Sequence, residues 1–196
     1  MTKARFLWLV APYAVWMALM AVLPQTACCY ALRGIATLAV FAVGACRGEY
    51  ASAFRRSERG WLPAGVGAGL AVFVVWIAPE MWLGVGTPVA AGESPYSPVN
   101  CGWGLTFAKL AASAFVIPVA EELFFRKWLV DFAGFWWMVA LFAVEHGERW
   151  YLGAAAGVAY GLVAKRFGLR AAVVAHVFTN LCLGILVLHL GRWQFW

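Results

Sequence analysis

The apolar residues of this chain fall into seven long runs, separated by short polar or Gly- and Pro-containing stretches. Runs of this kind are typical of helices that cross a lipid bilayer. The fifth and sixth runs are shorter than the roughly 20 residues of a full span, so an eighth, re-entrant or split helix stays open. The pattern predicts an all-α polytopic transmembrane bundle of about seven helices, at residues 6–24, 27–46, 63–83, 105–132, 134–147, 150–164 and 168–189.

Composition supports the same class of protein. Hydrophobic residues make up 64% of the 196 residues and charged residues only 12%, whereas a soluble domain is roughly half apolar and roughly a quarter charged. Lipid is the solvent that suits such a surface. Several of the 12 Trp lie where helix ends are expected, as in the aromatic belts at headgroup level. No long repeat or low-complexity tract divides the chain, so we expect one membrane domain over residues 1–196.

The basic residues predict the orientation of the helices. With the N-terminus inside, eleven Lys and Arg fall on the cytoplasmic side and three on the outer side, which is a strong positive-inside bias. The inner set is Lys3, Arg5, Arg47, Arg55, Arg56, Arg59, Arg126, Lys127, Lys165, Arg166 and Arg170; the outer set is Lys109, Arg149 and Arg192. We expect an integral membrane protein with a cytoplasmic N-terminus. The net charge of +6 comes from scattered loop residues, so we expect the lipid bilayer and no nucleic acid as a partner.

The first apolar run is long for a signal peptide. Phe6 to Leu23 spans 18 residues, compared with about 7–15 in the apolar region of a signal sequence. We therefore expect an uncleaved first helix.

Two loops and two glycine stripes complete the layout. Residues 47–61 predict a basic inner loop or short interfacial helix, and residues 84–104 predict an outer loop without basic residues. Two stripes of Gly recur every four residues, namely Gly153, Gly157 and Gly161 in the sixth helix, and Gly65 and Gly69 in the third. Such stripes line one helix face and let two helix backbones approach closely.

The fourth segment carries two adjacent acids, Glu121 and Glu122. A charged group at the centre of a membrane helix costs about 2.5–3.5 kcal/mol on insertion scales, so both are functional candidates. Glu122 stands four residues before Arg126, the favourable order for an ion pair within one helix. Glu121 points about 100° away and has no such partner, which suits a general base. Pro118, one turn earlier, is expected to kink the helix or free a carbonyl group.

Two further segments carry neutral polar groups. His146 follows Phe142 by four residues in the fifth segment, and Asn180 follows His176 by four residues in the seventh. At 1.5 Å per residue, these groups and Glu121 all lie about 12–18 Å from the inner ends of their helices. The three helices are therefore expected to bring their polar groups to one level.

Each motif also has a purely structural interpretation. Glu122 and Arg126 could form an ion pair that only sets helix register. His176 and Asn180 could serve interhelical hydrogen bonds, and His146 could be an interfacial residue. All three motifs fall in the same half of the chain at one depth, which favours the functional interpretation.

In this order, on successive helices, the three motifs resemble the CPBP family, the CAAX prenyl protease and bacteriocin-processing proteins that are also called Abi proteins. The motifs are Glu121-Glu122-x-x-x-Arg126, Phe142-x-x-x-His146 and His176-x-x-x-Asn180. The resemblance covers about residues 105–190, where we expect the catalytic helical core. The family often has Gly where Lys127 stands, a departure that concerns local packing. The Trp-rich sequence is also similar to the CAAX-protease-related proteins that accompany bacterial exosortase systems, a resemblance that implies a bacterial plasma (inner) membrane.

The resemblance implies a glutamate-type intramembrane endopeptidase that needs no cofactor. By position, Glu121 and His146 would activate a water. Glu122 and Arg126 would support and orient that acid, and His176 and Asn180 would donate to the oxyanion of the tetrahedral intermediate. The substrate would be a peptide bond near the C-terminus of a membrane-anchored or lipidated protein, reached from the inner leaflet.

Three other functions remain open. A zinc-dependent version of the same protease would use Glu121, His146 and His176 as ligands, although the HExxH spacing is absent and Asn180 is a poor zinc ligand. The chain could also have a non-catalytic role, as a scaffold, an immunity factor or an accessory protein of a sorting system. Such a role would gain nothing from six polar groups whose insertion into a membrane is costly. A transporter also uses buried carboxylates and histidines, but no inverted repeat supports one.

Overall fold

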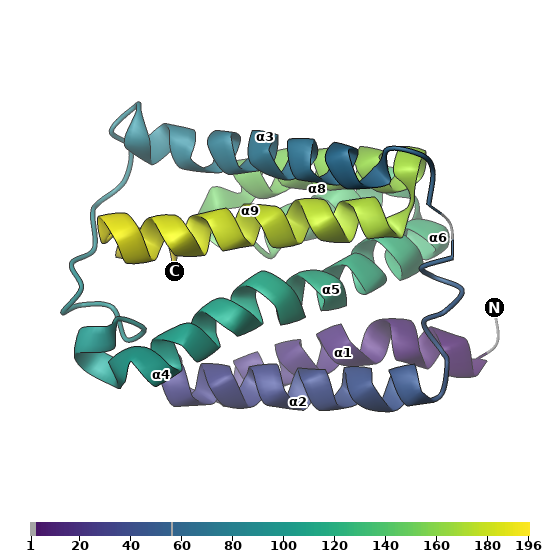
Figure 1. Ribbon diagram of the computed structural model, residues 1–196, viewed down its shortest axis with the longest axis horizontal. Coiled ribbons are helices and arrows are strands. Elements are labelled where there is room, and N and C mark those ends of the chain that lie inside the picture. Colours follow the sequence, from purple (N-terminus) through teal and green to yellow (C-terminus); the bar gives the residue numbers. More distant parts are fainter. Residues whose placement is uncertain (1–2, 56) are drawn as a thin grey trace.

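The computed structural model describes residues 3–55 and 57–196, with side chains from residue 6 onward, and this part of the chain is helical without strands (Figure 1). Seven helical rods run through it: Lys3–Val22 (α1), Ala27–Cys46 (α2), Trp61–Met81 (α3), Pro98–Ala133, Phe135–Val144 (α7), Trp150–Phe167 (α8) and Leu169–Leu190 (α9). Each predicted segment overlaps one rod, so the predicted all-α bundle is confirmed. The side chains of Lys3, Arg5 and Arg56, which count toward the predicted inner face, lie outside the described part.

The fourth rod is not a uniform α-helix. It consists of α4 (Pro98–Ala111), the π-helical turn η1 (Ala112–Val116), α5 (Ile117–Glu121), the π-helical segment η2 (Glu122–Leu129) and α6 (Val130–Ala133). It begins earlier than expected, so the predicted outer loop 84–104 is wrong over its last seven residues. Ser97 is the N-cap, and Pro98 fits the first helical position because its missing N–H would have no partner there. Gly102, with φ of 75°, marks a kink close to that start.

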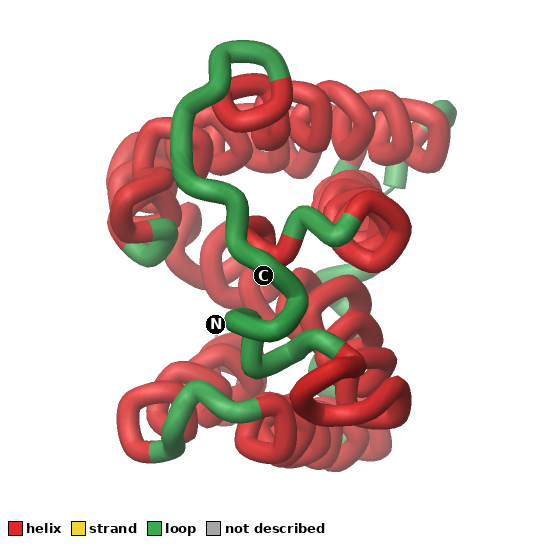
Figure 2. Tube along the Cα trace, turned by 90° about the vertical axis from the view of Figure 1, so that its left-hand side faces the viewer, coloured by secondary structure: helices red, strands yellow, loops and turns green. Residues whose placement is uncertain are grey.

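The rods form two groups with the fourth rod between them (Figure 1). α1 and α2 lie along one side of the bundle, α3, α8 and α9 lie along the other, and the fourth rod crosses obliquely between them. α9 packs most extensively against α3, and α7 packs against α8. Figure 2 shows the loop between α3 and α4 crossing one end of the bundle. The fourth rod and α9 are therefore central, and they carry five of the six predicted site residues.

Glycines set the distance between two pairs of helices. At Gly65 on α3, an added Cβ would lie 2.7 Å from the Ala171 carbonyl oxygen on α9. At Gly153 on α8, it would lie 2.8 Å from Nδ1 of His146. Neither position has room for a side chain. Both predicted glycine stripes are confirmed as faces of close helix packing.

Four of the rods are long and apolar enough to cross a membrane: α2, α3, Pro98–Ala133 and α9. Phe6–Val22 and α7 are shorter apolar helices. Large apolar side chains remain exposed on the outside of the rods, among them Ile35, Leu70 and Trp136. Such an extensive apolar surface is unfavourable in water. The chain is a membrane protein whose apolar surface contacts lipid.

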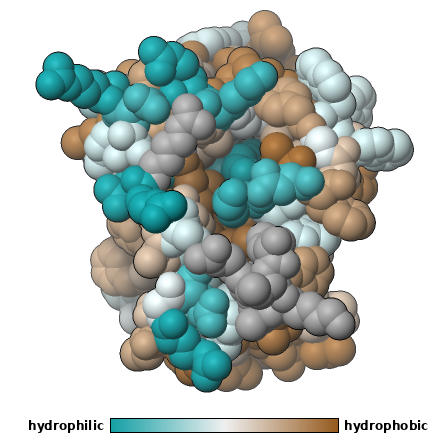
Figure 3. Space-filling view, turned by 90° about the vertical axis from the view of Figure 1, so that its right-hand side faces the viewer, coloured by the Kyte–Doolittle hydropathy of each residue, from teal (hydrophilic) through white to brown (hydrophobic). Residues whose placement is uncertain are grey.

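One end of the bundle is hydrophilic (Figure 3). A cavity of about 430 Å³ lies at this end and is lined by Arg126, Lys127, Asp131 and Lys165, among others. The predicted inner loop also reaches this cavity, because Ser52 lines it. Residues 47–53 of that loop form consecutive turns rather than a helix.

Candidate active site

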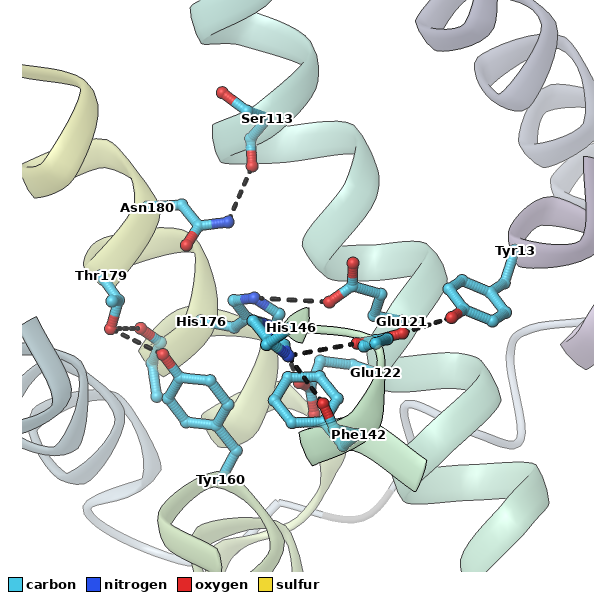
Figure 4. A network of polar contacts seen from close by, with 12 residues as sticks. Tyr13, Ser113, Glu121, Glu122, Phe142, His146, Tyr160, His176, Thr179 and Asn180 are labelled. Atoms are coloured by element: carbon cyan, nitrogen blue, oxygen red, sulfur yellow. Dashed lines mark hydrogen bonds and ion pairs between the residues drawn. The ribbon is translucent and has the colours of Figure 1, made fainter. Parts of the chain in front are cut away.

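Four of the six predicted residues line one cavity of about 90 Å³ inside the bundle. Glu121 comes from α5, His146 from the turn after α7, and His176 and Asn180 from α9 (Figure 4). Tyr160 on α8 lines the same cavity. Side chains from distant parts of the sequence thus meet at one level, as their depths along the helices predict.

Glu122 and Arg126 form a buried ion pair beside this cavity. Arg126 Nη1 lies 3.1 Å from Glu122 Oε1, and both side chains are 0% exposed. The guanidinium group also lies over the Phe142 ring, with Cζ 3.9 Å from the ring centroid. The negative face of the ring attracts the cation and offsets part of the desolvation of the pair. The ion pair expected from the spacing is therefore confirmed.

His176 lies between the two acids. Its Nδ1 is 3.0 Å from Glu122 Oε1, and its Nε2 is 3.6 Å from Glu121 Oε2. Because the ion-paired Glu122 carboxylate can only accept a hydrogen bond, we assign a proton to Nδ1 of His176. The distance of 3.6 Å to Glu121 exceeds a hydrogen bond. Glu121 therefore keeps its carboxylate open to another partner in the cavity.

His146 is oriented by the end of its own helix. α7 ends at Val144, three residues before the predicted limit, so His146 lies in the turn that follows. Its Nδ1 is 2.6 Å from the Phe142 carbonyl oxygen. A carbonyl group only accepts, so Nδ1 carries the proton and Nε2 is left with a free electron pair. The ring lies against Trp76 and Phe142, with centroids 5.2 and 4.7 Å away, which fixes its position.

Asn180 replaces a hydrogen bond that proline removes. In η1 the Ile117 N–H donates to the Ala112 carbonyl group, and the same register would join residue 118 to Ser113. Pro118 has no N–H, and Asn180 Nδ2 donates to the Ser113 carbonyl oxygen at 2.9 Å instead. A backbone carbonyl inside a membrane requires such a partner. One of the two amide hydrogens of Asn180 remains available to another acceptor.

Replacing Asn180 with Ala should destabilise the fold, because the Ser113 oxygen then loses its partner, at a cost of about 1–3 kcal/mol. In a Pro118→Ala background the same replacement should cost less, since the new alanine N–H can donate to Ser113. Denaturant unfolding of the four proteins in detergent measures this coupling as a double-mutant cycle. Equal costs in the two backgrounds would show that the proline does not create the need for Asn180.

A hydroxyl pair on one side of the cavity was not expected from the sequence. Tyr160 donates to Thr179 Oγ1 at 2.8 Å, and Thr179 donates to the Gly69 carbonyl oxygen of α3, also at 2.8 Å. The Tyr160 ring stacks on His176, with centroids 4.8 Å apart. Thr179 follows His176 by three residues, and that spacing places both on one helix face. The spacing was therefore a usable signal for Thr179.

A third acid, Glu145, lies next to His146. Its side chain is only 14% exposed, and Tyr13 of α1 donates a hydrogen bond to it. From the sequence alone Glu145 resembles an ordinary polar residue at a helix end. The contact joins residues 132 positions apart, and no local pattern could have indicated it.

Glu121, His146 and His176 are also the ligands of the zinc-dependent alternative. Among the residues that the structure describes, no group of three His, Cys, Asp or Glu side chains is placed to hold a metal ion. The Nδ1 atoms of His146 and His176 both face oxygen acceptors, which leaves their Nε2 atoms available to a ligand, as in zinc-binding histidines. The absence of cofactors therefore stays a prediction.

Residues 102–182 match the family model described as type II CAAX prenyl endopeptidase Rce1-like. No curated protein and no solved structure matches the chain. The matched segment contains all six predicted site residues, from Glu121 to Asn180. The resemblance to the CAAX prenyl protease family is confirmed over this segment, and it points to a protease.

Proposed function

We propose that this chain is an intramembrane endopeptidase that hydrolyses a peptide bond in a membrane-associated or lipidated protein. The observation that carries the proposal is the pairing pattern of the two acids. Glu122 is neutralised by Arg126, whereas Glu121 faces a polar cavity without a hydrogen bond from the described side chains. A carboxylate held this way in an apolar bundle suits a general base. The family match supports the same reaction.

In the proposed reaction, a water in the cavity attacks the scissile carbonyl carbon and gives its proton to Glu121. His146 accepts a hydrogen bond from this water at Nε2, because its Nδ1–H donates to the Phe142 carbonyl oxygen. When the C–N bond breaks, the leaving amine takes up the proton that came from the water. One group can serve both steps because a general base becomes a general acid once it is protonated.

The negative charge on the carbonyl oxygen needs hydrogen-bond donors. Asn180 has one amide hydrogen beyond the one that Ser113 accepts. His176 can donate from Nε2, 3.6 Å from Glu121, when its ring carries a proton on both nitrogens. That second proton belongs to His176, so the proton that Glu121 takes from the water remains for the leaving amine. Fixed donors in a site without bulk water stabilise developing charge more than water does.

The location and substrate class complete the proposal. We place the protein in a bacterial plasma membrane, as the resemblance to exosortase-associated proteins suggests. The distribution of basic residues favours an N-terminus in the cytoplasm. The 430 Å³ cavity at the hydrophilic end reaches Arg126, beside the site, and offers a route for substrate from the cytoplasmic side. A CAAX-type prenylated protein is the first substrate class to test, given the family match.

The C-termini of membrane proteins should differ between cells with the wild-type chain and cells with Glu121→Gln. We expect shortened C-termini to disappear in the variant, as measured by proteomics of C-terminal peptides. Glu93→Gln is the matched control, because it makes the same chemical change at an exposed carboxylate in the loop between α3 and α4. If the C-termini are the same in all three strains, the chain is a scaffold, an accessory protein or a transporter.

Chelation separates the zinc-dependent alternative from the metal-free reaction. Activity of the purified protein should persist after exhaustive treatment with a chelator. Loss of activity that added zinc restores would instead support the zinc-dependent version of the protease.

Gly153→Ala should lower the cleavage rate by about tenfold to a hundredfold, because a displacement of about 1 Å in a catalytic group has effects of this size. The added methyl group would lie 2.8 Å from Nδ1 of His146 and must displace the imidazole. Gly67→Ala on α3 is the control, since nothing lies within 4 Å of its new methyl group. The measurement is the initial rate of peptide cleavage by protein in lipid vesicles. An unchanged rate in Gly153→Ala would show that the position of His146 does not matter.

A further inference from the structure

A second polar pocket, of about 150 Å³, adjoins the site. Trp76 and Asn180 line both this pocket and the site cavity, so the two spaces meet at these side chains. The rest of the second pocket combines cations and aromatic rings, among them Lys109, Arg149 and Trp196. It lies toward the opposite end of the bundle from the large hydrophilic cavity, because Lys109 belongs to the first helix of the fourth rod and Arg126 to its second half.

Lys109 is the unusual residue in this pocket. It is only 6% exposed, although it belongs to the apolar rod Pro98–Ala133. The ammonium nitrogen lies over three rings, 3.9 Å from the centroid of Tyr30, 5.0 Å from that of Tyr96 and 5.4 Å from that of Trp196. No carboxylate of the described residues forms an ion pair with it.

A second buried cation stands behind Lys109. The guanidinium carbon of Arg33 lies 5.4 Å from the same Tyr30 ring, and the side chain is 0% exposed. Its hydrogen bonds go to neutral groups, the carbonyl oxygens of Cys29 and Pro24 and the side chain of Gln25. Arg33 therefore adds positive charge to this region without bringing an anion.

The other cation of the pocket is already paired. Arg149 forms an ion pair with Glu80 and donates to the Gln194 carbonyl oxygen at 2.9 Å. Aromatic rings attract a cation but do not neutralise it, and a buried charge without a counter-ion is costly. Lys109 and Arg33 are thus two buried cations without a carboxylate partner among the described residues, and together they favour an anion in this pocket. Of the two, Lys109 lines the pocket.

We infer that Lys109 binds the C-terminal carboxylate of the peptide that is cut off, with Arg33 strengthening the positive potential. This inference rests on the proposed endopeptidase function. Both pockets meet at Asn180, so a peptide bound across the site reaches Lys109 on its leaving side. The rings and Leu183 offer contacts to apolar side chains of that peptide.

The spacing along the fourth rod limits the length of the leaving peptide. Twelve residues separate Lys109 from Glu121, a rise of about 18 Å. An extended peptide covers about 3.3–3.6 Å per residue, so about five residues at most fit between the cut bond and the terminal carboxylate. The enzyme would then select its substrates by a free chain end close to the scissile bond.

Binding of a short peptide to the full-length protein in detergent tests this inference without any cleavage. The probes are N-acetyl-Val-Ile-Met as the free acid and as the C-terminal amide, and the readout is the unfolding temperature as a function of probe concentration. The free acid should bind at least tenfold more tightly than the amide. Lys109→Gln should abolish this preference, and Lys109→Arg should retain most of it. Arg170→Gln, at an exposed cation of the other end, should leave it unchanged.

Several results would overturn the inference. Equal binding of acid and amide, no binding of either up to millimolar concentration, or an acid preference that survives Lys109→Gln would each do so. Stabilisation by phosphatidylglycerol that depends on Lys109, without any acid preference, would assign the pocket to a lipid headgroup instead. A wild-type protein that binds the acid selectively yet cleaves no peptide would refute the proposed function alone. Equal cleavage of substrates ending in a free acid and in an amide would refute only the role of Lys109.

Discussion

Glu121→Gln should lower the rate of peptide cleavage by about a thousandfold, while the unfolding temperature stays close to that of the wild type. The amide keeps the size of the side chain but cannot take a proton from water, and general-base catalysis contributes about 10²–10⁴-fold. Glu121 makes no ion pair with an Arg or Lys of the described side chains, so its replacement leaves none of these cations without a partner. The measurement is the initial rate of cleavage of an S-prenylated peptide by purified protein in lipid vesicles.

Glu122→Gln is the matched comparison, because it makes the same chemical change one residue further along. This variant removes the partner of Arg126 and of His176 Nδ1, so both activity and stability should fall. A Glu121→Gln protein that keeps more than a tenth of the wild-type rate would rule out Glu121 as the base. A Glu122→Gln protein of unchanged stability would rule out the structural role of Glu122.

Arg126→Met should destabilise the protein by about 3–5 kcal/mol, since it leaves a buried carboxylate without its counter-ion. The Glu122 side chain is 0% exposed, so water cannot take over the role of Arg126. Adding Glu122→Gln to this variant should recover part of the loss, because removing both charges is often close to neutral. Denaturant unfolding in detergent micelles gives the four free energies of unfolding that are needed.

The neighbouring ion pair provides the control. Lys127 and Asp131 have the same spacing and an N–O distance of 3.0 Å, but their side chains are 38% and 55% exposed. Lys127→Met should therefore change the free energy of unfolding by less than about 1 kcal/mol. Similar losses for Arg126→Met and Lys127→Met would mean that burial does not determine the strength of this ion pair.

The sequence predicts those parts of the fold and site that depend on local periodicity. The apolar runs place all seven rods, because a membrane helix is limited by its own length and composition. The spacing of Glu122 and Arg126 predicts their ion pair, and the glycine stripes predict the close helix faces, because both follow from the helical repeat. Pro118 was expected to free a carbonyl group, and Asn180 binds the carbonyl of Ser113.

The remaining features depend on contacts between helices that no local pattern specifies. His176 contacts Glu122 from 54 positions away, and Tyr13 reaches Glu145 from the first helix. The end of α7 was predicted three residues late because Glu145 and His146 continue the pattern of the segment although their backbone forms a turn. Lys109 was counted only among the outer-side basic residues, since its aromatic neighbours come from three other parts of the chain.

The contact between α3 and α9 determines how much of the chain is needed to support this site. α3 lies outside the segment 102–182, yet Thr179 donates to the backbone carbonyl of its Gly69. At this contact α3 contributes a carbonyl group and the absence of a side chain, neither of which forms a motif of functional groups. A search for motifs therefore does not detect this part of the support for the site. A graft of residues 102–182 into another bundle would keep all the motifs and lose this support.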